Sequence, residues 1–283
     1  MTVHLPVLQP LTEQVEEGTV KKHVSYSELA VWMDCAFKHK LKYISKIDLD
    51  GPSVHTEFGH VIHDICEEYL RTKTLPISFD EKRQELTSLF EKFNLKGNPK
   101  EFQDVLEPIA LEVPGFLDEN FKDWEYIGAE EKLYEAIGVQ NDMFFKGFID
   151  GIIRVPKSSR LKKAKPNDFE YHIVDWKSAG WGWDFKKKTD PKKIMQLALY
   201  KHFWSTKLGI PLKEIRTGFV LLKRTPLKGK SRCELVPVSI GELTIERALD
   251  TLSKMTGSVK KGFSPKNKNS CKYCVYKQTE HCP

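Results

Sequence analysis

Asp175 and Lys177 directly follow the apolar run Tyr171–Val174, and this placement of two charges constrains the fold more than any other feature of the chain. The apolar run predicts a central, buried strand. Alternate side chains of a strand share a face, so Asp175 and Lys177 lie side by side while Trp176 points to the opposite face. Because aspartate is disfavoured inside strands, the pattern indicates a functional site at the end of this strand.

A second aspartate lies in another predicted strand, within the sequence Gly147–Asp150. Burial among apolar residues is costly for a carboxylate unless a cation or a hydrogen bond balances its charge. If Asp150 and Asp175 converge, their oxygens form a pocket for a hard divalent cation, with Lys177 beside it. Such a pocket suits the hydrolysis of a phosphodiester. The alternative is that each carboxylate is a strand-end group that pairs with a lysine.

Two further motifs flank this pair, one on a predicted helix before it and one on a predicted helix after it. In chain order the four motifs are Gly59–His63, Gly147–Asp150, Asp175–Lys177 and Gln196–Tyr200. Their order and spacing resemble the PD-(D/E)XK nuclease superfamily, and within it the RecB-like branch that includes the CRISPR-associated adaptation nucleases and the nuclease subunits of bacterial recombination helicases. Each motif alone is weak, but four in the family's order are specific. The resemblance covers most of the chain, from about residue 25 to residue 282.

The resemblance implies an α/β fold, a restriction-endonuclease-like core with a central mixed β-sheet flanked by helices. It also implies a metal-dependent DNA nuclease, most often an exonuclease on single-stranded ends, in recombination, repair, replication or spacer acquisition. The family's Mg2+ or Mn2+ would be held by His63, Asp150, Asp175 and the main-chain carbonyl of Trp176. Lys177 would orient or deprotonate the attacking water, or stabilise negative charge as it develops.

His63 lies at the edge of the apolar stripe of its predicted helix, whereas His60 falls on the polar side. Gly59, one turn earlier, leaves a notch through which a metal or a phosphate could approach the imidazole. A boundary histidine bonded to a carbonyl is the alternative. As a nitrogen ligand among oxygens, His63 would make manganese a good metal. Either Glu130 or Glu131 could supply the further carboxylate that the family often has.

The net charge of the chain is a modest +6. Its lysines and arginines, however, are clustered in Lys157–Lys165, Lys186–Lys193, Lys223–Arg232 and Lys260–Lys272. Basic loops beside a metal site suit a polyanion, because phosphate neutralisation dominates nucleic-acid affinity. Ordinary solvated loops are the alternative. The predicted DNA contacts are Lys186, Lys187, Trp181, Gln196 and Tyr200.

Aromatic residues accompany these lysines. Trp181, Trp183 and Phe185 would stack the bases of a threaded single strand, which tolerates any sequence. Gln196 and Tyr200 lie four residues apart on one helix face, within reach of a phosphate or base near the metal. An ordinary helix surface is the alternative for this pair. DNA is therefore the expected partner, with single-stranded ends preferred.

Several classes of protein are excluded or disfavoured. No apolar run approaches the ~18 residues of a membrane span, and the acidic, proline-containing residues 1–22 do not form a signal peptide, so a cytoplasmic protein is expected. No helicase motif such as G-x-x-x-x-G-K-[ST] occurs, so unwinding would need a helicase or another recombination or adaptation protein as a partner. Two other functions stay open, a non-catalytic DNA-binding or scaffold subunit of the same fold and an RNA nuclease. The complete catalytic set favours an enzyme.

Three cysteines with the spacing C-x2-C-x7-C stand near the end of the sequence, at Cys271, Cys274 and Cys282. In a cytoplasmic protein such clustering indicates a metal more often than a disulfide. Zinc could take His281 as its fourth ligand. The family resemblance instead implies Cys35, on the first predicted helix, as the distant fourth ligand of a structural 4Fe-4S cluster. Cys66 and Cys233 are expected to be buried, small apolar residues.

Periodicity and turn signals divide the chain into helices and strands. Helices are predicted over about Ser25–Tyr43, Thr56–Arg71, Phe79–Phe93, Pro99–Phe121, Pro191–Lys207 and Gly241–Lys260. Strands are predicted over about Tyr126–Ile137, Met143–Val155, Tyr171–Ser178, Thr217–Lys223 and Cys233–Val238. Pro108 and Pro114 are expected to break the fourth helix. The predicted domains are an irregular arm (1–22), a helical region with the His motif and the first cluster cysteine (23–122), a nuclease core (123–260) and a cysteine tail (261–283).

Overall fold

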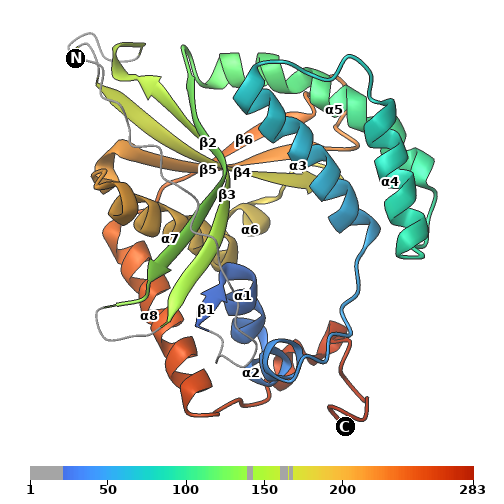
Figure 1. Ribbon diagram of the computed structural model, residues 1–283, viewed down its shortest axis with the longest axis vertical. Coiled ribbons are helices and arrows are strands. Elements are labelled where there is room, and N and C mark those ends of the chain that lie inside the picture. Colours follow the sequence, from blue (N-terminus) through green and yellow to red (C-terminus); the bar gives the residue numbers. More distant parts are fainter. Residues whose placement is uncertain (1–21, 139–142, 160–164, 166–167) are drawn as a thin grey trace.

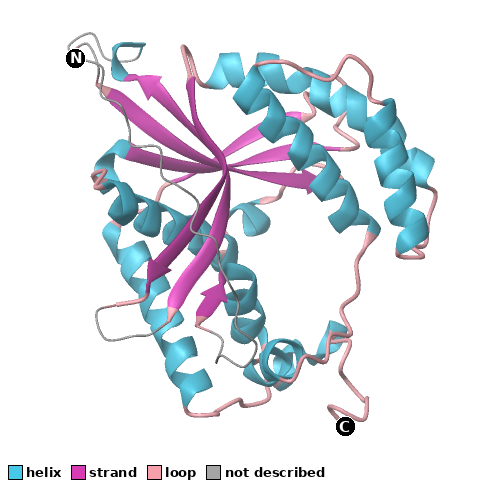
Figure 2. Cartoon of the chain, viewed as in Figure 1, coloured by secondary structure: helices cyan, strands magenta, loops and turns pink. Residues whose placement is uncertain are grey.

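A mixed β-sheet of six strands runs through the centre of the structure and carries helices on both faces (Figures 1 and 2). This computed structural model describes residues 22–138, 143–159, 165 and 168–283. Most of the predicted arm, the turn of the hairpin after Ile137 and part of the cluster Lys157–Lys165 lie outside the described residues. The sheet between helical layers confirms the predicted α/β class.

The strands follow the order β1-β3-β4-β5-β6, and β2 pairs with β3 off this path. Their bounds are β1 His23–Ser25, β2 Glu125–Ala136, β3 Phe144–Pro156, β4 Phe169–Ala179, β5 Ile215–Lys223 and β6 Cys233–Val238. β1 runs parallel to β3 and β4 parallel to β5, while the other pairs are antiparallel. The five predicted strands are confirmed. β1 was not predicted, because three residues are too few to show an alternating pattern.

Helices cover the sheet on both sides, with α3, α4 and α5 over one face and α7 and α8 over the other (Figure 1). Their bounds are α1 Tyr26–Asp34, α2 Ala36–His39, α3 Val54–Thr72, α4 Asp80–Lys92, α5 Pro99–Asn120, α6 Phe185–Lys188, α7 Pro191–Leu208 and α8 Glu242–Lys260. In the described part of the chain, no helix combines the length and the apolar character that crossing a bilayer requires. The division into four domains stays a prediction.

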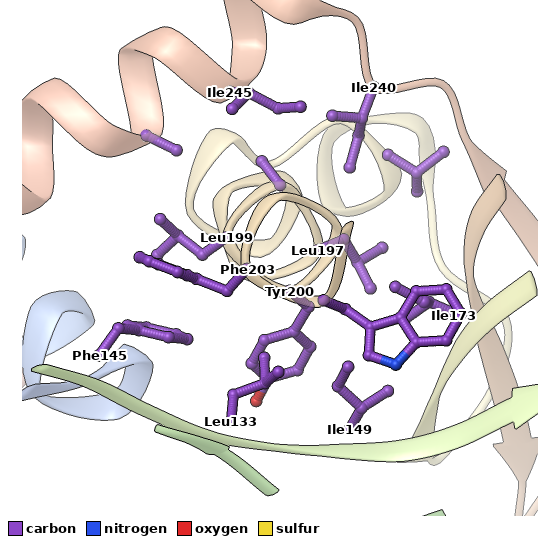
Figure 3. Close-up of a cluster of buried hydrophobic side chains, with 14 of the residues drawn as sticks. Leu133, Phe145, Ile149, Ile173, Leu197, Leu199, Tyr200, Phe203, Ile240 and Ile245 are labelled. Carbon is purple, nitrogen blue, oxygen red and sulfur yellow. The ribbon is translucent and has the colours of Figure 1, made fainter. Parts of the chain in front are cut away.

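The apolar core on the α7 side fixes the helix that follows the Asp175 strand. Figure 3 shows Tyr200 and Phe203 of α7 facing Phe145 and Ile149 of β3. The rings of Phe145 and Phe203 stack with their centroids 4.7 Å apart. Tight packing of this kind holds α7, and the polar residues on it, in one position against the sheet.

The core on the α3 side orients the central strand. The predicted stripe of α3 is buried, and it consists of Phe58, Ile62, Ile65 and Tyr69. Trp176 of β4 is fully buried in the same core. Lys177 approaches the ring of Phe219, in the opposite core, at 6.0 Å. Successive residues of β4 therefore point to opposite faces, as the sequence predicts.

The expectation that prolines break the helix at α5 is wrong. α5 is continuous from Pro99 to Asn120, with Pro108 and Pro114 inside it. An interior proline costs about 3 kcal/mol of helix stability. The buried face of α5 offsets this cost, since Leu106, Ile109 and Val113 are completely excluded from solvent. Tertiary packing thus overrides the local preference.

The first predicted helix is not continuous to Tyr43. It begins as expected, with the Ser25 side chain accepting from the Glu28 N–H and the Glu28 carboxylate accepting from the Ser25 N–H. It stops at Cys35, whose backbone is extended, and resumes as α2. The Asp34 carbonyl accepts hydrogen bonds from Asn267 and Ser270 of the tail, at 2.9 and 2.6 Å. These bonds satisfy a carbonyl that an unbroken helix would have used internally.

Candidate active site

β3 and β4 separate at the two aspartates that the sequence singled out. Their pairing runs from Pro156 and Phe169 to Gly151 and Val174, and the next residues are Asp150 and Asp175. The Asp150 Oδ2 accepts a hydrogen bond from the Trp176 N–H at 2.9 Å. The carboxylate thus replaces a backbone acceptor at the point where the strands part. This fork brings Asp150 and Asp175 to one place.

Asp175 is almost completely buried, with 1 % of its surface exposed. Its carboxylate forms an ion pair with the Lys177 ammonium. Beyond this ion pair, no hydrogen bond within the described residues reaches either of its buried oxygens. A buried carboxylate with unused acceptor capacity is costly unless a further cation or donor completes it.

α3 brings His63 to the fork. The His63 Nδ1 lies 3.7 Å from the Asp150 Oδ2, whereas His60 is exposed and lies 3.7 Å from a carboxylate oxygen of Glu57. Gly59 is buried, and a Cβ built there would meet one atom within 4 Å, the Ser178 Oγ of β4 at 3.4 Å. The approach of a metal or a phosphate past Gly59 to the imidazole stays a prediction.

Burial and mutual charge shift the pKa values of the four titratable groups at the fork. Burial raises the pKa of Asp150 and of Asp175 from 3.8 to about 6, although Lys177 opposes the shift. Burial, and then the charge of Lys177, lowers the pKa of His63 to about 4. Burial disfavours the charged Lys177, but attraction to Asp175 and Asp150 outweighs it and raises the pKa of Lys177. A neutral imidazole, two carboxylates and an ammonium therefore share the site near neutral pH.

The two candidate glutamates of β2 differ in their partners and in their position relative to the fork. Glu131 binds the Lys207 ammonium at 2.6 Å. Glu130 lies across from Asp150, because the flanking pairs join Ala129 to Gly151 and Glu131 to Ile149. Its φ of 50° is unusual for a non-glycine residue in a strand, and such strain is concentrated at functional sites. The geometry selects Glu130 as the carboxylate nearer the fork.

Glu67 is a further carboxylate of the site that sequence reasoning missed. It is 7 % exposed and lies one helical turn after His63 on α3. Burial, and then the charges of Glu130 and Asp150, raise the pKa of Glu67 to about 8. Its position four residues after His63 was the available signal, since such residues share a helix face.

The donor types at the fork fit a hard divalent cation. Carboxylate oxygens from Asp150 and Asp175 are the ligands that Mg2+ prefers, and the imidazole of His63 adds affinity for Mn2+. The two buried Asp175 oxygens have capacity for such an ion. Across the described residues, however, no three His, Cys, Asp or Glu side chains are already gathered in a metal-holding group. Lys177 supplies the positive charge next to Asp175 in this structure.

Gln196 and Tyr200 of α7 adjoin the fork from the other face. The Gln196 Nε2 donates to the Tyr200 hydroxyl at 3.3 Å. Tyr200 is buried, and a Cβ on Gly147 would lie 2.9 Å from its ring. Burial, and then the charge of Asp175, raises the pKa of Tyr200. Tyr200 therefore lies against β3 within the electrostatic range of the Asp175 carboxylate.

The loop after β4 carries exposed aromatic and basic side chains. Trp181 is 72 % exposed and Phe185 is 82 % exposed, and Lys186 and Lys187 lie in α6. The expectation that Trp183 stacks on substrate is wrong. It is buried against the ring of Phe219, at 5.2 Å between centroids. Trp183 thus anchors the loop to the core.

Four cysteines line one cavity of about 760 Å³ between the tail and the α1–α2 break, and they are Cys35, Cys271, Cys274 and Cys282. Asn267 bridges two of them, since its N–H donates to the Cys35 Sγ at 3.3 Å and its carbonyl accepts from the Cys271 Sγ at 3.7 Å. Figure 1 shows the tail beside α1 and α2. His281 pairs with Glu280 at 3.4 Å. Cys66 and Cys233 are buried elsewhere, as predicted.

Comparison with models of protein families matches residues 23–282 to the PD-(D/E)XK nuclease superfamily. The matched region contains the whole sheet, the fork between β3 and β4, and all four cysteines of the cavity. Comparison with curated proteins gives no significant match.

Proposed function

This chain belongs to the PD-(D/E)XK nuclease superfamily, a class of metal-dependent nucleases, and on that premise we propose that it is an exonuclease of single-stranded DNA ends. The observation that carries the proposal is the fork, where Asp150 and Asp175 meet with His63 and Lys177 beside them. The buried, incompletely bonded oxygens of Asp175 are suited to a cation that also binds a phosphate.

Each residue at the fork has a proposed role. Mg2+ or Mn2+, when bound, would lower the pKa of a water and neutralise charge on the phosphate. Asp150, Asp175, His63 and the Trp176 carbonyl would hold the ion. The Trp176 N–H donates to Asp150 and so fixes the orientation of that carboxylate. Lys177, paired with Asp175, would orient the attacking water or stabilise charge that develops on the phosphate.

The loop after β4 supports a single-stranded substrate. Trp181 and Phe185 present open ring faces on which bases can stack whatever their sequence. Lys186 and Lys187 of α6 would neutralise phosphates of the same strand. Gln196 would contact the strand where it enters the fork, and the buried Tyr200 would hold Gln196 in place through their hydrogen bond. A partner protein with helicase activity would supply single strands from duplex DNA.

We also propose that the cysteine cavity holds a structural 4Fe-4S cluster and that the chain is of the RecB-like branch, although among the described residues no three of these cysteines are already gathered in a metal-holding group. Four thiolates are the ligand set of such a cubane, and here four cysteines line one cavity. Zinc is the alternative metal for four cysteines. The tail is already bonded to the end of α1 through Asp34. A cluster at this position would lock that contact, and hydrolysis requires no redox step from it.

Cleavage is expected to slow on the acidic side of the pH profile. Both aspartates must be ionised to bind a cation, and their pKa is raised from 3.8 to about 6. Protons therefore compete with Mn2+ as the pH falls through about 6, and this competition is absent above about 7. Mn2+ affinity and the cleavage rate at limiting Mn2+ should both fall in this window. An affinity that stays constant down to about pH 5 would contradict the prediction.

Replacement of Trp181 by alanine should weaken single-strand binding and leave the catalytic fork intact. Loss of one stacked base costs roughly 1–3 kcal/mol.

Lys186→Ala should also weaken single-strand binding. It should reduce the salt dependence of that binding, because one phosphate contact is lost. Fluorescence anisotropy with labelled oligonucleotides at several salt concentrations measures both effects. Lys254→Ala, on the exposed surface of α8, is the matched control.

The preference for ends is tested with substrates that differ only in form. Linear single strands, circular single strands, linear duplex and covalently closed duplex are incubated with the protein and Mn2+. The proposal predicts that linear single strands are degraded fastest and that closed duplex is not degraded. Equal cleavage of closed duplex and linear single strands would refute exonuclease action while leaving nuclease action intact. Matched RNA strands test whether the enzyme prefers DNA.

A further inference from the structure

One side of α3 follows the catalytic fork along its length. His55, Gly59, His63 and Glu67 succeed one another every four residues. Gly59 faces Ser178 of β4, and His63 faces Asp150 of β3. The two ends of this line differ in charge, because Glu67 lies near Glu130 at one end and His55 lies near Arg224 at the other. The carboxylate of Glu130 would repel a phosphate backbone at the first end, and the guanidinium of Arg224 would attract it at the second.

Arg224 is held at the second end by the strand that carries the catalytic residues. Its backbone N–H donates to the carbonyl of Ala179, the last residue of β4, at 2.9 Å. Its guanidinium carbon lies 4.9 Å from the centre of the Phe102 ring of α5. The His55 ring lies against the same phenylalanine, with the ring centroids 5.7 Å apart. Phe102 therefore contacts both the Arg224 guanidinium and the His55 ring.

The guanidinium of Arg224 is only partly exposed, yet no carboxylate among the described residues pairs with it. Four arginines of the described chain have such partners: Arg71 with Glu68, Arg83 with Asp80 and Glu107, Arg154 with Glu125, and Arg216 with Glu170. Arg232 instead donates to the carbonyls of Lys223 and Arg224. Partial burial lowers the pKa of Arg224 and so disfavours its charge. An anion from outside the chain would balance the charge of Arg224. A phosphate suits this role, because two of its oxygens can accept parallel hydrogen bonds from the planar guanidinium.

Two backbone lengths, one along β4 and one along α3, place Ala179 and His55, which are neighbours of Arg224, about equally far from the catalytic residues. Along β4, the four residues from Asp175 to Ala179 span about 13 Å at ~3.3 Å each. Along α3, the eight residues from His63 back to His55 span about 12 Å at ~1.5 Å each. A stacked strand advances ~3.4 Å per nucleotide, so this distance corresponds to about four nucleotides.

We propose that Arg224, supported by Phe102 and flanked by His55, binds a backbone phosphate of the nucleic-acid substrate about four nucleotides from the scissile phosphate. The inference rests on the proposed nuclease function and deepens it. It assigns the path of the strand along α3, away from Glu67 and Glu130. Arg224 is a positioning residue in this account, because it contacts the strand without contacting the reacting phosphate.

The test uses single-stranded oligonucleotides of increasing length with the full chain and Mn2+. For the wild type, kcat/KM should rise about tenfold when the oligonucleotide becomes long enough to reach Arg224, the scale of one charge-assisted hydrogen bond. Arg224→Met should lose this step through KM, with kcat and the cleavage of the shortest oligonucleotides unchanged. The salt dependence of binding should fall by about one phosphate contact. Arg224→Lys should retain that salt dependence.

Arg216→Met is the matched control, since Arg216 stands at the opposite end of β5 and pairs with Glu170. It should behave like the wild type. Identical length dependence in the wild type and in Arg224→Met would overturn the inference, as would an equal loss of activity at every length. If the wild type cleaves no oligonucleotide, the proposed function fails. The phosphate contact of Arg224 is then tested by the binding of a labelled 12-mer without metal. Arg224→Met must weaken this binding, and Arg216→Met must leave it unchanged.

Discussion

Asp175→Ala should lower the rate of DNA cleavage by at least about 10²- to 10³-fold, the scale of losing one preorganised electrostatic group. Asp175 is buried at the fork, its oxygens accept no hydrogen bond from the described residues beyond the Lys177 ion pair, and Lys177 is held by it. The substitution would therefore remove a proposed metal ligand and release the lysine. DNA binding should persist, because in this proposal the basic loops outside the fork provide most of the phosphate contacts. Single-turnover cleavage and fluorescence anisotropy measure the two effects separately.

Two further variants make this result specific. Lys177→Ala should lose activity to a similar extent, since Lys177 is the ammonium paired with Asp175. Asp250→Ala removes a carboxylate from the exposed surface of α8, where it pairs with Lys254, and should leave cleavage unchanged. An Asp175→Ala protein that cleaves at the wild-type rate would remove Asp175 from the catalytic site.

Cys274→Ala should eliminate bound iron, the brown colour and much of the thermal stability. Protein purified without oxygen should contain about four irons, as a cubane held by four thiolates requires. Cys274 lines the cavity together with Cys35, Cys271 and Cys282. A shared cluster would join two distant parts of the chain, and because loop-closure entropy rises slowly with length, a few kcal/mol is the expected scale. Iron analysis and thermal unfolding measure the loss.

Activity should fall with the iron because the tail and the active site share α1. Asn267 and Ser270 of the tail bind Asp34, and the Tyr26 hydroxyl donates to the Lys192 carbonyl of α7 at 2.7 Å. Cys233→Ala is the control, since Cys233 is buried outside the cavity and the variant should keep its iron. One tightly bound zinc and no iron in anaerobic protein would overturn the iron-sulfur assignment and leave the nuclease assignment standing.

Periodicity in the sequence predicted most of the sheet and its helices, because burial imposes repeats of 2 and 3.6 residues. It also predicted that Asp175 and Lys177 share one face of β4 and that Trp176 points to the other, where the structure buries it. The points at which helices end were less predictable. α5 continues through Pro108 because its buried face outweighs a local cost, and the first helix stops at Cys35 because the tail binds Asp34.

Contacts between distant segments account for what the sequence did not reveal at the site. Nothing local indicates that β3 and β4 part after Gly151 and Val174, so the convergence of the aspartates was only a hypothesis. Glu67 became visible once α3 was placed over the fork. The position of Gly59 beside Ser178 of β4 likewise became visible only in the fold. These features depend on how elements pack, which short motifs do not encode.

The most direct test of the account is whether purified protein hydrolyses end-labelled single-stranded DNA only when a divalent metal is present. With Mn2+ or Mg2+, the wild type should shorten the strand, and chelation by EDTA should stop the reaction. Asp150→Asn and His63→Ala should bind the strand without shortening it. Absence of cleavage by anaerobically prepared, iron-containing wild type with Mn2+, or cleavage that persists unchanged in EDTA or in Asp150→Asn, would contradict a metal-dependent nuclease site at the fork of β3 and β4.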